Sequence, residues 1–327
     1  MNIITNPGRL RGIGRRIQVE KISRRSVLKG LGIAGGFVLA APVISRQAFA
    51  AYKTGAGDMP HGTVVDPRVF VAIASDGTVT IVAHRAEMGT GVRTSLPLIV
   101  AEEMEADWSR VKIQQAHGDE VRFGNQDTDG SRSTRHYLLP MRQIGASARA
   151  MLEAAAAKRW GVPAAEVKAV NHEVVHFATS RRLGFGELAA DAAKEPVPGV
   201  EGLKLKNPAD FRYLGKGQIG IVDLRDITVG TARYGGDVRL PGMKYAVIAR
   251  PPVTGGKLKS FDATDAMKVS GVEKVMEVQG WPWPSKFQPL GGVAVIARNT
   301  GAAIKGRDAL KIFWDDGSNG KYESAAY

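Results

Sequence analysis

The sequence contains no cysteine among its 327 residues. This absence excludes disulfide bridges, thiolate metal sites, a cysteine nucleophile and any iron–sulfur cluster held by this chain. A redox centre in such a protein must therefore be held by other groups. Aromatic residues are also few, at 7%, whereas the 44% of apolar residues is ordinary for a globular protein with one to three cores.

Acidic residues are outnumbered by basic ones, and the formal net charge is +13. The excess is concentrated in residues 1–50, which carry a net charge of +8 and leave +5 for the rest of the chain. Neither a zinc-finger spacing nor a run of interleaved basic and aromatic residues occurs. We therefore expect no nucleic-acid partner.

Three zones divide the first fifty residues. A basic segment comes first, Ser23-Arg24-Arg25-Ser26-Val27-Leu28-Lys29 follows, and an apolar stretch at 30–41 precedes Ala48-Phe49-Ala50. This order resembles a twin-arginine signal peptide with small residues at its cleavage site. The protein is therefore expected to be exported, already folded, by the twin-arginine translocase to the periplasm. Because the apolar stretch is well short of the ~20 residues that span a bilayer, cleavage is favoured, and membrane association is the alternative.

Beyond residue 68, strand patterns, polar loops and helical patterns alternate. The expected elements are a hairpin over 69–83, a Gly-containing loop at 87–91, a helix over 94–106, a strand at 111–115, a polar loop at 125–135 and a helix over 140–160. Pro140 is placed at the start of the last helix and Gly161 at its stop. Two loops rich in amides and hydroxyls thus each precede a helix.

A stretch rich in Pro and Gly, 195–220, predicts a linker before a second unit. The elements expected in that unit are strands at 245–250, 257–261, 273–278, 292–297 and 311–314 and helices at 263–267 and 300–310. This order predicts an α+β fold in which helices cover one face of a small sheet.

His172-Glu173-Val174-Val175-His176 matches the H-E-x-x-H motif of zinc metalloproteases. The motif needs a helix to place both imidazoles on one zinc ion, but β-branched residues and turn formers surround it here. On a strand, the two histidines would lie ~13 Å apart. We interpret the segment as an edge strand with exposed histidines, and a zinc protease through His172, Glu173 and His176 is the less favoured alternative. The single histidines, expected on the surface or in loops, are His84, His117 and His136.

Two loops have the composition of a binding site. The paired glycines of Met88-Gly89-Thr90-Gly91 let the backbone approach a ligand, and the helix N-terminus that follows favours an anion. Asp129-Gly130-Ser131-Arg132-Ser133-Thr134 offers hydroxyls, amides and an arginine suited to phosphate or a polar heterocycle. A purely structural turn is the alternative for each loop.

Longer strings around these loops are similar to a known family. They are His84–Glu103, Asp129–Thr134, Met141–Leu152, Gly184–Leu188, Tyr234–Ala246, Ser270–Val272 and Gly292–Ala297. They resemble the molybdenum hydroxylase family, which includes xanthine dehydrogenase and aldehyde oxidase, and within it the large subunits of the isoquinoline 1-oxidoreductase type. The resemblance covers nearly all of residues 69–316.

The resemblance implies a partial molybdopterin-binding domain of mixed sheets and helices followed by an α/β hammerhead domain. The expected segments are a signal peptide at 1–50, a linker at 51–68, the N-terminal part of the molybdopterin-binding region at 69–194, a linker at 195–222, the hammerhead domain at 223–316 and a truncated tail at 317–327.

The resemblance also implies a cofactor, molybdenum on a pyranopterin dinucleotide, usually the cytosine form in bacteria. The residues carried over as cofactor-binding are Gly89, Thr90, Gly91, Gly130, Ser131, Ser133 and Thr134. Many relatives have Gln where this chain has Thr90. A dithiolene on the pterin holds the metal, so no side chain of this chain is expected to ligate it.

The implied reaction is hydroxylation of an aldehyde or of a carbon next to nitrogen in a heteroaromatic ring. Electrons are expected to leave through a small [2Fe-2S] subunit, with a cytochrome c as a further acceptor. The family's catalytic glutamate is expected beyond Tyr327, so no residue here is assigned as catalytic. We therefore expect an N-terminal portion of a longer subunit that is inactive alone. An inactive remnant or interaction module is the alternative.

Overall fold

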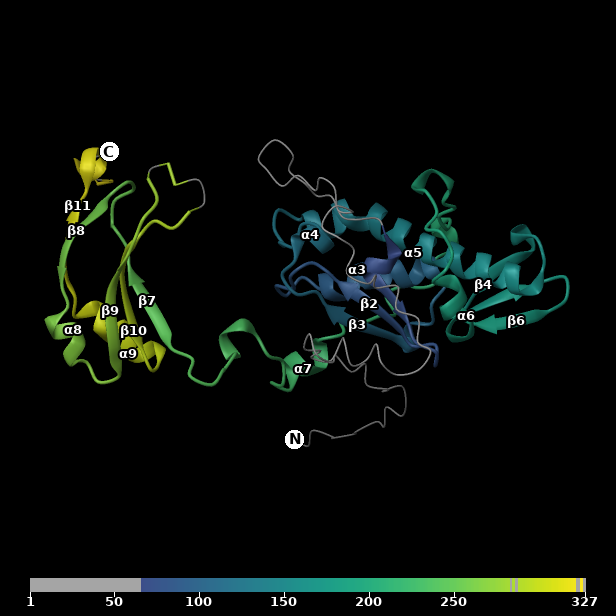
Figure 1. Cartoon of the computed structure of the whole chain (residues 1–327), viewed down its shortest axis with the longest axis horizontal. Coiled ribbons are helices and arrows are strands. Elements are labelled where there is room, and N and C mark those ends of the chain that lie inside the picture. Colours follow the sequence, from purple (N-terminus) through teal and green to yellow (C-terminus); the bar gives the residue numbers. More distant parts are fainter. Residues whose placement is uncertain (1–65, 283, 286–287, 322–323, 326–327) are drawn as a thin grey trace, which may run out of the picture. The chain divides into compact units, whose positions relative to one another are not determined.

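The computed structural model of the protein describes residues 66–282, 284–285, 288–321 and 324–325 (Figure 1). The predicted signal peptide and nearly all of the first predicted linker lie outside these residues. The chain divides into two compact units, and the boundary lies between Ala232 and Arg233. Both units mix helices and sheets, which confirms the predicted α+β class at this level.

The first unit begins with a sheet and a crossover helix. Its first elements are α2 (Pro67–Phe70), β1 (Val71–Ile73), β2 (Val79–Ala83), α3 (Val92–Met104) and β3 (Val111–Gln115). The predicted hairpin is confirmed as antiparallel β1 and β2, and β3 pairs parallel with β2. A parallel pair needs a crossover connection, which α3 supplies. Alternate residues of β2 are buried, so one face of this sheet packs on the core.

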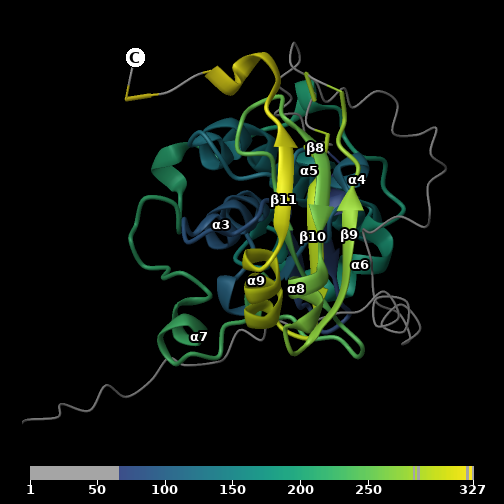
Figure 2. The ribbon, with the colours of Figure 1, turned by 90° about the vertical axis from the view of Figure 1, so that its left-hand side faces the viewer.

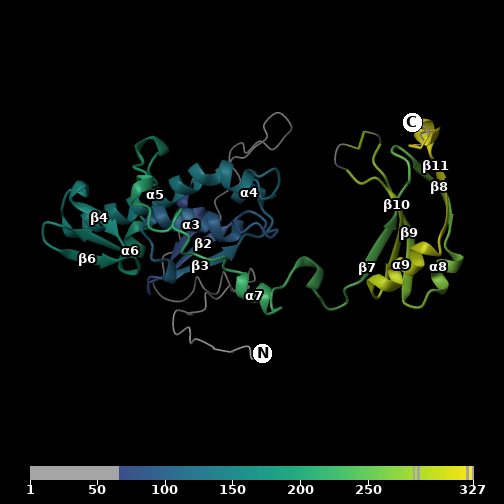
Figure 3. The ribbon, with the colours of Figure 1, turned by 180° about the vertical axis from the view of Figure 1, so that it is seen from behind.

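The long helix α5 (Arg132–Trp160) packs along α3 (Figures 1 and 3). Its start corrects two predictions, because the helix begins eight residues before Pro140 and the polar loop ends at Ser131. The helix continues through Pro140, whose fixed φ is helical although its nitrogen cannot donate a hydrogen bond, and Ser133 and Tyr137 on the preceding turns are buried.

A second small sheet completes the first unit. It consists of β4 (Val167–Val170), β5 (Glu173–His176) and β6 (Arg181–Gly184), all antiparallel and with β5 in the centre, followed by α6 (Phe185–Ala192). Figures 1 and 3 both place this sheet and α6 at one end of the unit and α4 at the other. The short helices of this unit are η2 (Trp108–Arg110), α4 (Glu120–Phe123), η3 (Ala164–Glu166), η4 (Val200–Gly202), η5 (Pro208–Asp210) and α7 (Leu224–Thr228).

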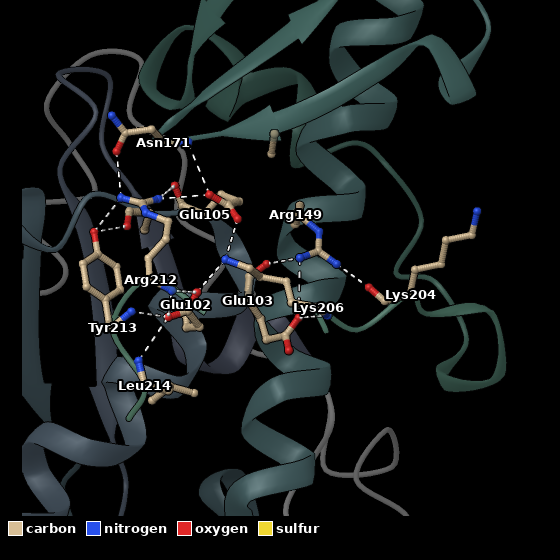
Figure 4. A network of polar contacts seen from close by, with 12 residues as sticks. Glu102, Glu103, Glu105, Arg149, Asn171, Lys204, Lys206, Arg212, Tyr213 and Leu214 are labelled. Atoms are coloured by element: carbon tan, nitrogen blue, oxygen red, sulfur yellow. Dashed lines mark hydrogen bonds and ion pairs between the residues drawn. The ribbon is translucent and has the colours of Figure 1, made fainter. Parts of the chain in front are cut away.

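Residues 203–214 are hydrogen-bonded to buried carboxylates at the C-terminal end of α3 (Figure 4). Glu102 accepts hydrogen bonds from the backbone N–H groups of Arg212 at 3.0 Å and Tyr213 at 2.7 Å. Burial alone would raise the pKa of Glu102, but the Lys206 ammonium and these N–H groups lower it below its ordinary value. This part of the region expected to be a linker therefore packs on the first unit, although the predicted domain boundaries as a set remain predictions.

Glu103 of α3 contacts both α5 and the segment 203–214 (Figure 4). Its carboxylate accepts from the Arg142 Nε at 2.6 Å and from the backbone N–H of Lys206 at 3.0 Å. Arg149 lies 3.5 Å from the second carboxylate oxygen. Because every charge in this cluster is paired, its burial is compatible with a stable fold.

The strands and helices of the second unit can be followed in Figure 2. Its elements are η6 (Gly235–Asp237), β7 (Tyr245–Ala249), β8 (Lys257–Asp262), α8 (Thr264–Lys268), β9 (Val272–Val278), β10 (Gly292–Ala297), α9 (Thr300–Asp308), β11 (Lys311–Asp315) and η7 (Gly317–Lys321). β10 is flanked by β7 and β9, β11 pairs with β8, and all pairs are antiparallel. The strands and helices predicted here are confirmed to within two residues, whereas the hammerhead assignment remains a prediction.

Candidate functional site

The loop between β2 and α3 is shaped by two glycines and one carboxylate. Gly89 and Gly91 have φ angles of 94° and 78°, a left-handed conformation that glycine adopts most readily. Glu87 folds back onto this turn, and its Oε1 accepts hydrogen bonds from the N–H groups of Gly89 at 2.6 Å and Gly91 at 3.0 Å. Its Oε2 accepts from the N–H of Arg93 at 3.0 Å. Since Gly91, the N-cap of α3, has no side chain, Glu87 takes over the capping of this helix.

The charge of Glu87 is stabilised by the same contacts. Partial burial alone would raise its pKa, but the N–H groups of Arg93, Gly91 and Gly89 outweigh burial and hold the pKa below its ordinary value. The carboxylate is therefore ionised at neutral pH, and the start of α3 already binds an anion that belongs to the chain.

The second candidate loop leads into α5. Gly130 and Ser131 both have positive φ, 48° and 56°, and left-handed backbone is uncommon for a serine. Ser131 is the N-cap of α5, but its side chain makes no capping hydrogen bond. Asp129 accepts from the Arg132 Nε at 2.9 Å, and Arg132 lowers the pKa of this carboxyl. The Ser131 hydroxyl is thus not used to cap the helix.

The two loops, far apart in the sequence, lie side by side. The N–H of Ala86 donates to the carbonyl of Gln126 at 2.9 Å, and the Thr128 hydroxyl donates to the carbonyl of Ala86 at 2.6 Å. Backbone bonds of this kind fix one segment against the other. The structure therefore brings together the two loops that the sequence predicted separately.

Arg85 is a fully buried cation behind both loops. Its Nε donates to Ser133 Oγ at 3.2 Å and its Nη1 to the Asn125 carbonyl at 3.0 Å. The guanidinium lies over the Tyr137 ring, 4.9 Å from the centroid, while within the described chain its Nη2 has no hydrogen-bond partner. No role was predicted for Arg85 from the sequence, although an arginine two residues after the end of a strand with alternating apolar residues was a visible signal.

The predicted cofactor-binding residues do not all face solvent. The exposed ones are Gly89, Thr90, Gly130, Ser131 and Thr134, and Gly91 is half-buried. Ser133 is buried, accepts from Arg85 and donates to the Thr128 hydroxyl at 3.3 Å. Ser133 therefore joins the loops from inside, and the binding role of the whole set remains a prediction.

The environment of His84 corrects the expectation of a surface or loop histidine. Its side chain is completely buried, with ring centroids of Phe70 and Tyr137 at 5.4 and 4.7 Å. Burial, helped by the neighbouring Arg85 charge, lowers its pKa to about 3. In the described chain neither ring nitrogen has a hydrogen-bond partner. His84 is therefore neutral at physiological pH. Of the other two, His117 is exposed and His136 is half-buried.

The histidines of the H-E-x-x-H string are buried rather than exposed, and β5 is a central strand rather than an edge strand. His172 accepts at Nδ1 from the N–H of Asp107 at 3.1 Å, and its Nε2 contacts the Gly77 carbonyl at 2.8 Å. His176 Nε2 lies 3.0 Å from a Glu166 carboxylate oxygen. Each ring thus has its own partners, and the strand supplies no helical zinc motif.

The donor set at the two loops fits uncharged polar groups of a large ligand. Exposed hydroxyls at Thr90, Ser131 and Thr134 can donate and accept. No atom lies within 4 Å of the position that a Cβ would take on Gly89, so a ligand can approach the backbone there. Phosphate groups fit the first loop less well, because the backbone N–H groups of Gly89 and Gly91 already donate hydrogen bonds to Glu87. Among the described residues, no group of three or more His, Asp or Glu side chains could hold a metal ion.

Comparisons with known proteins point to one family. Residues 14–215 match the model of the molybdopterin cofactor-binding domain. The chain is 32% identical to the beta subunit of isoquinoline 1-oxidoreductase of Brevundimonas diminuta, over 86% of this chain and 40% of the relative. It is also 32% identical to a protein of Gluconacetobacter polyoxogenes named membrane-bound aldehyde dehydrogenase [pyrroloquinoline-quinone], over 95% of this chain and 40% of the relative.

A third relative belongs to the nicotinate dehydrogenase of Pseudomonas putida and is 29% identical over 75% of this chain and 20% of the relative. The chain thus spans about two fifths of the length of the first two relatives. In the described residues, no helix is both long and apolar enough to cross a bilayer. On the family match and these identities, the chain belongs to the molybdopterin cofactor-binding family of molybdenum hydroxylase large subunits.

Proposed function

We propose that this chain is the cofactor-binding part of a molybdenum-dependent oxidoreductase that hydroxylates an aldehyde or a carbon beside nitrogen in a heteroaromatic ring. The observation that carries the proposal is the junction of the two predicted loops through Arg85 and Ser133. The names of the relatives, which refer to isoquinoline, nicotinate and aldehyde, support the substrate classes. In such a reaction the carbon gains an oxygen from water and releases two electrons and two protons.

A bound molybdenum cofactor would supply the two-electron chemistry, because the cysteine-free chain has no redox group of its own. The chain's contribution is to bind and orient. Thr90, Ser131 and Thr134 present hydroxyls to the polar edge of the cofactor, and Arg85 holds the second loop against the first. We propose the cytosine dinucleotide form of the cofactor and a small partner subunit with [2Fe-2S] clusters that passes electrons on to a cytochrome c.

The direct test is elemental analysis of the full chain, purified with its neighbouring gene products from a host that makes molybdenum cofactor. Stoichiometric molybdenum and release of cytidine monophosphate on hydrolysis are expected. Thr90→Val should lower molybdenum content about two- to tenfold, the effect of one lost hydrogen bond. The matched control Thr254→Val, an exposed threonine of the second unit, should leave it unchanged. A protein without molybdenum would be a remnant that keeps the fold and has lost the site.

Export through the twin-arginine pathway is also part of the proposal. It is supported by Arg24 and Arg25 followed by a short apolar stretch. Fractionation of cells should place the mature protein in the periplasm. The double variant Arg24→Lys and Arg25→Lys should retain it in the cytoplasm, and unchanged export of this variant would contradict the assignment.

A further inference from the structure

The amides that a phosphate would use at the start of α3 are already bound to a carboxylate of the chain. Helix N-termini preceded by glycine loops bind anions through backbone N–H groups and the helix dipole. Here those N–H groups belong to Gly89, Gly91 and Arg93, and all three donate to Glu87. The acceptor comes from the same loop, two to six residues earlier in the sequence.

The cation on the first turn of α3 is already engaged in an ion pair, although the buried Arg93 Nε has no hydrogen-bond partner among the described residues. The Arg93 guanidinium pairs with Asp223 at 2.8 Å. The N–H of Val222 donates to Thr94 Oγ1 at 3.0 Å, so residues 221–223 are tied to the first turn of α3. The Ile221 side chain lies 3.4 Å from the position that a Cβ on Gly91 would take. A phosphate at these amides would therefore have to displace an ionised carboxylate.

We infer that Glu87 is the positioning residue of the cofactor loop: its carboxylate is the resident anion at the start of α3, and the loop therefore meets the cofactor through neutral hydrogen-bonding groups rather than through phosphate. This inference rests on the proposed function. It assigns the exposed Thr90 hydroxyl and the open backbone at Gly89 to the pterin or nucleoside part of the cofactor, and it places the pyrophosphate elsewhere.

The first experiment measures backbone hydrogen exchange at Gly89, Gly91 and Arg93 in the full chain. Glu87→Ala removes the acceptor of all three N–H groups and should accelerate their exchange about tenfold or more. Glu87→Gln keeps one neutral acceptor oxygen and should give an intermediate rate. The matched control is Glu173→Gln, a half-buried glutamate of the same unit that pairs with Arg182 at 3.0 Å. It should leave exchange at the loop unchanged, and unchanged exchange in Glu87→Ala would overturn the inference.

The second experiment adds inorganic pyrophosphate or acetate to the same samples. In the wild-type protein neither anion should slow exchange at the three amides, because Glu87 occupies them. In Glu87→Ala, acetate or pyrophosphate should restore protection at these positions by taking the vacated site. Slowing of the wild-type exchange by pyrophosphate would show that phosphate displaces Glu87, and would contradict the inference even if a variant failed to fold.

Molybdenum content separates this inference from the proposed function. Glu87→Ala and Glu87→Gln should retain less molybdenum than Glu173→Gln when each is purified from a host that makes the cofactor. Altered exchange with full molybdenum content in both Glu87 variants would remove the positioning role and leave the proposed function standing. Absence of molybdenum from the wild-type protein would refute the proposed function, whereas the exchange data would still report on the loop.

Discussion

The two units of the molecule bury their side chains to different degrees. In the first unit α3 is enclosed along most of its length, and even Glu102 and Glu103 are at most 1% exposed. In the second unit, neither β8 nor β11 contains a fully buried residue, while β10 is buried along most of its length. Large apolar side chains such as Phe313, 62% exposed, remain open to solvent in the described part of this unit.

This difference in burial indicates that the candidate loops belong to the more tightly packed of the two units. The first unit encloses the carboxylates of Glu102 and Glu103 because each is paired with cations and N–H groups, and such a satisfied polar network rigidifies the helix that follows the first loop. The second unit has a small core of alanines and valines on β10 and α9. Equivalent substitutions should therefore cost much more in the first unit than in the second. Urea unfolding, followed by hydrogen exchange of peptides from each unit, can test this expectation.

The largest difference in lost stability is expected between two alanine variants, each of which replaces one glutamate in one of the two units. Glu103→Ala leaves the partly buried Arg142 and Arg149 side chains without their buried carboxylate and should lower the free energy of unfolding by about 3 kcal/mol. Glu273→Ala removes an exposed pair with Lys244 and should cost less than about 0.5 kcal/mol. Equal losses would show that the buried cluster contributes no more than a surface ion pair.

The second comparison is between the stability losses of two glycine-to-alanine variants, each in a helix of one unit. In Gly145→Ala the new Cβ would lie 2.5 Å from the Val100 carbonyl oxygen, part of the backbone of α3, and the variant should lose roughly 2 to 3 kcal/mol. In Gly306→Ala the Cβ would meet methyl groups of Val272 and Val295 at 2.7 and 2.8 Å.

Those side chains can shift, and alanine in place of glycine gains about 1 kcal/mol of helix propensity, so Gly306→Ala should change stability by less than about 1 kcal/mol. The same propensity gain applies to Gly145→Ala and cannot explain a difference. A loss as large at Gly306 as at Gly145 would show that the second unit is packed as tightly as the first.

A third prediction concerns pH in the first unit. Burial and the Arg85 charge lower the pKa of His84 to about 3, whereas the unfolded chain has an ordinary value near 6.5. Between these values only the unfolded state binds the proton, so stability falls as the pH drops through this window. His84→Leu should reduce the loss of stability between pH 7.5 and pH 5 by about 2 kcal/mol. His117→Leu, at an exposed position, is the control and should alter this loss little.

The smallest effect on stability is expected for an exposed apolar side chain of the second unit. Phe313→Ser replaces a side chain on β11 that is mostly exposed, and stability should change by no more than about 0.5 kcal/mol. A loss of several kcal/mol would mean that Phe313 is covered in solution and would weaken the contrast between the units.

Local patterns were sufficient to predict most elements. β3 and β10 match their predicted ranges, because strands with alternating or continuous apolar residues were bounded by turn formers. The predicted start of α5 was wrong because Pro140 is compatible both with a first helical turn and with the interior of a helix. Sequence spacing does not distinguish the two cases.

The buried polar residues of the first unit could not be predicted in the same way. His84 was expected on the surface or in a loop, and His172 and His176 were expected to be exposed on an edge strand, yet each is at most 3% exposed. Their burial depends on side chains from distant segments, such as Phe70 and Tyr137 around His84. Residue type predicts exposure only on average, and tertiary packing decides the individual case.

By itself the sequence determined the α+β class, the absence of any thiolate chemistry, the two Gly- and Ser-rich loops and the resemblance that the family match confirmed. These properties depend on residue type and short-range spacing. Only the tertiary structure decided that the loops meet through Arg85 and that Glu87 occupies the amides at the start of α3. Hydrogen bonds act over about 3 Å, so which donors remain free for a ligand is settled only when the folded chain has placed every acceptor.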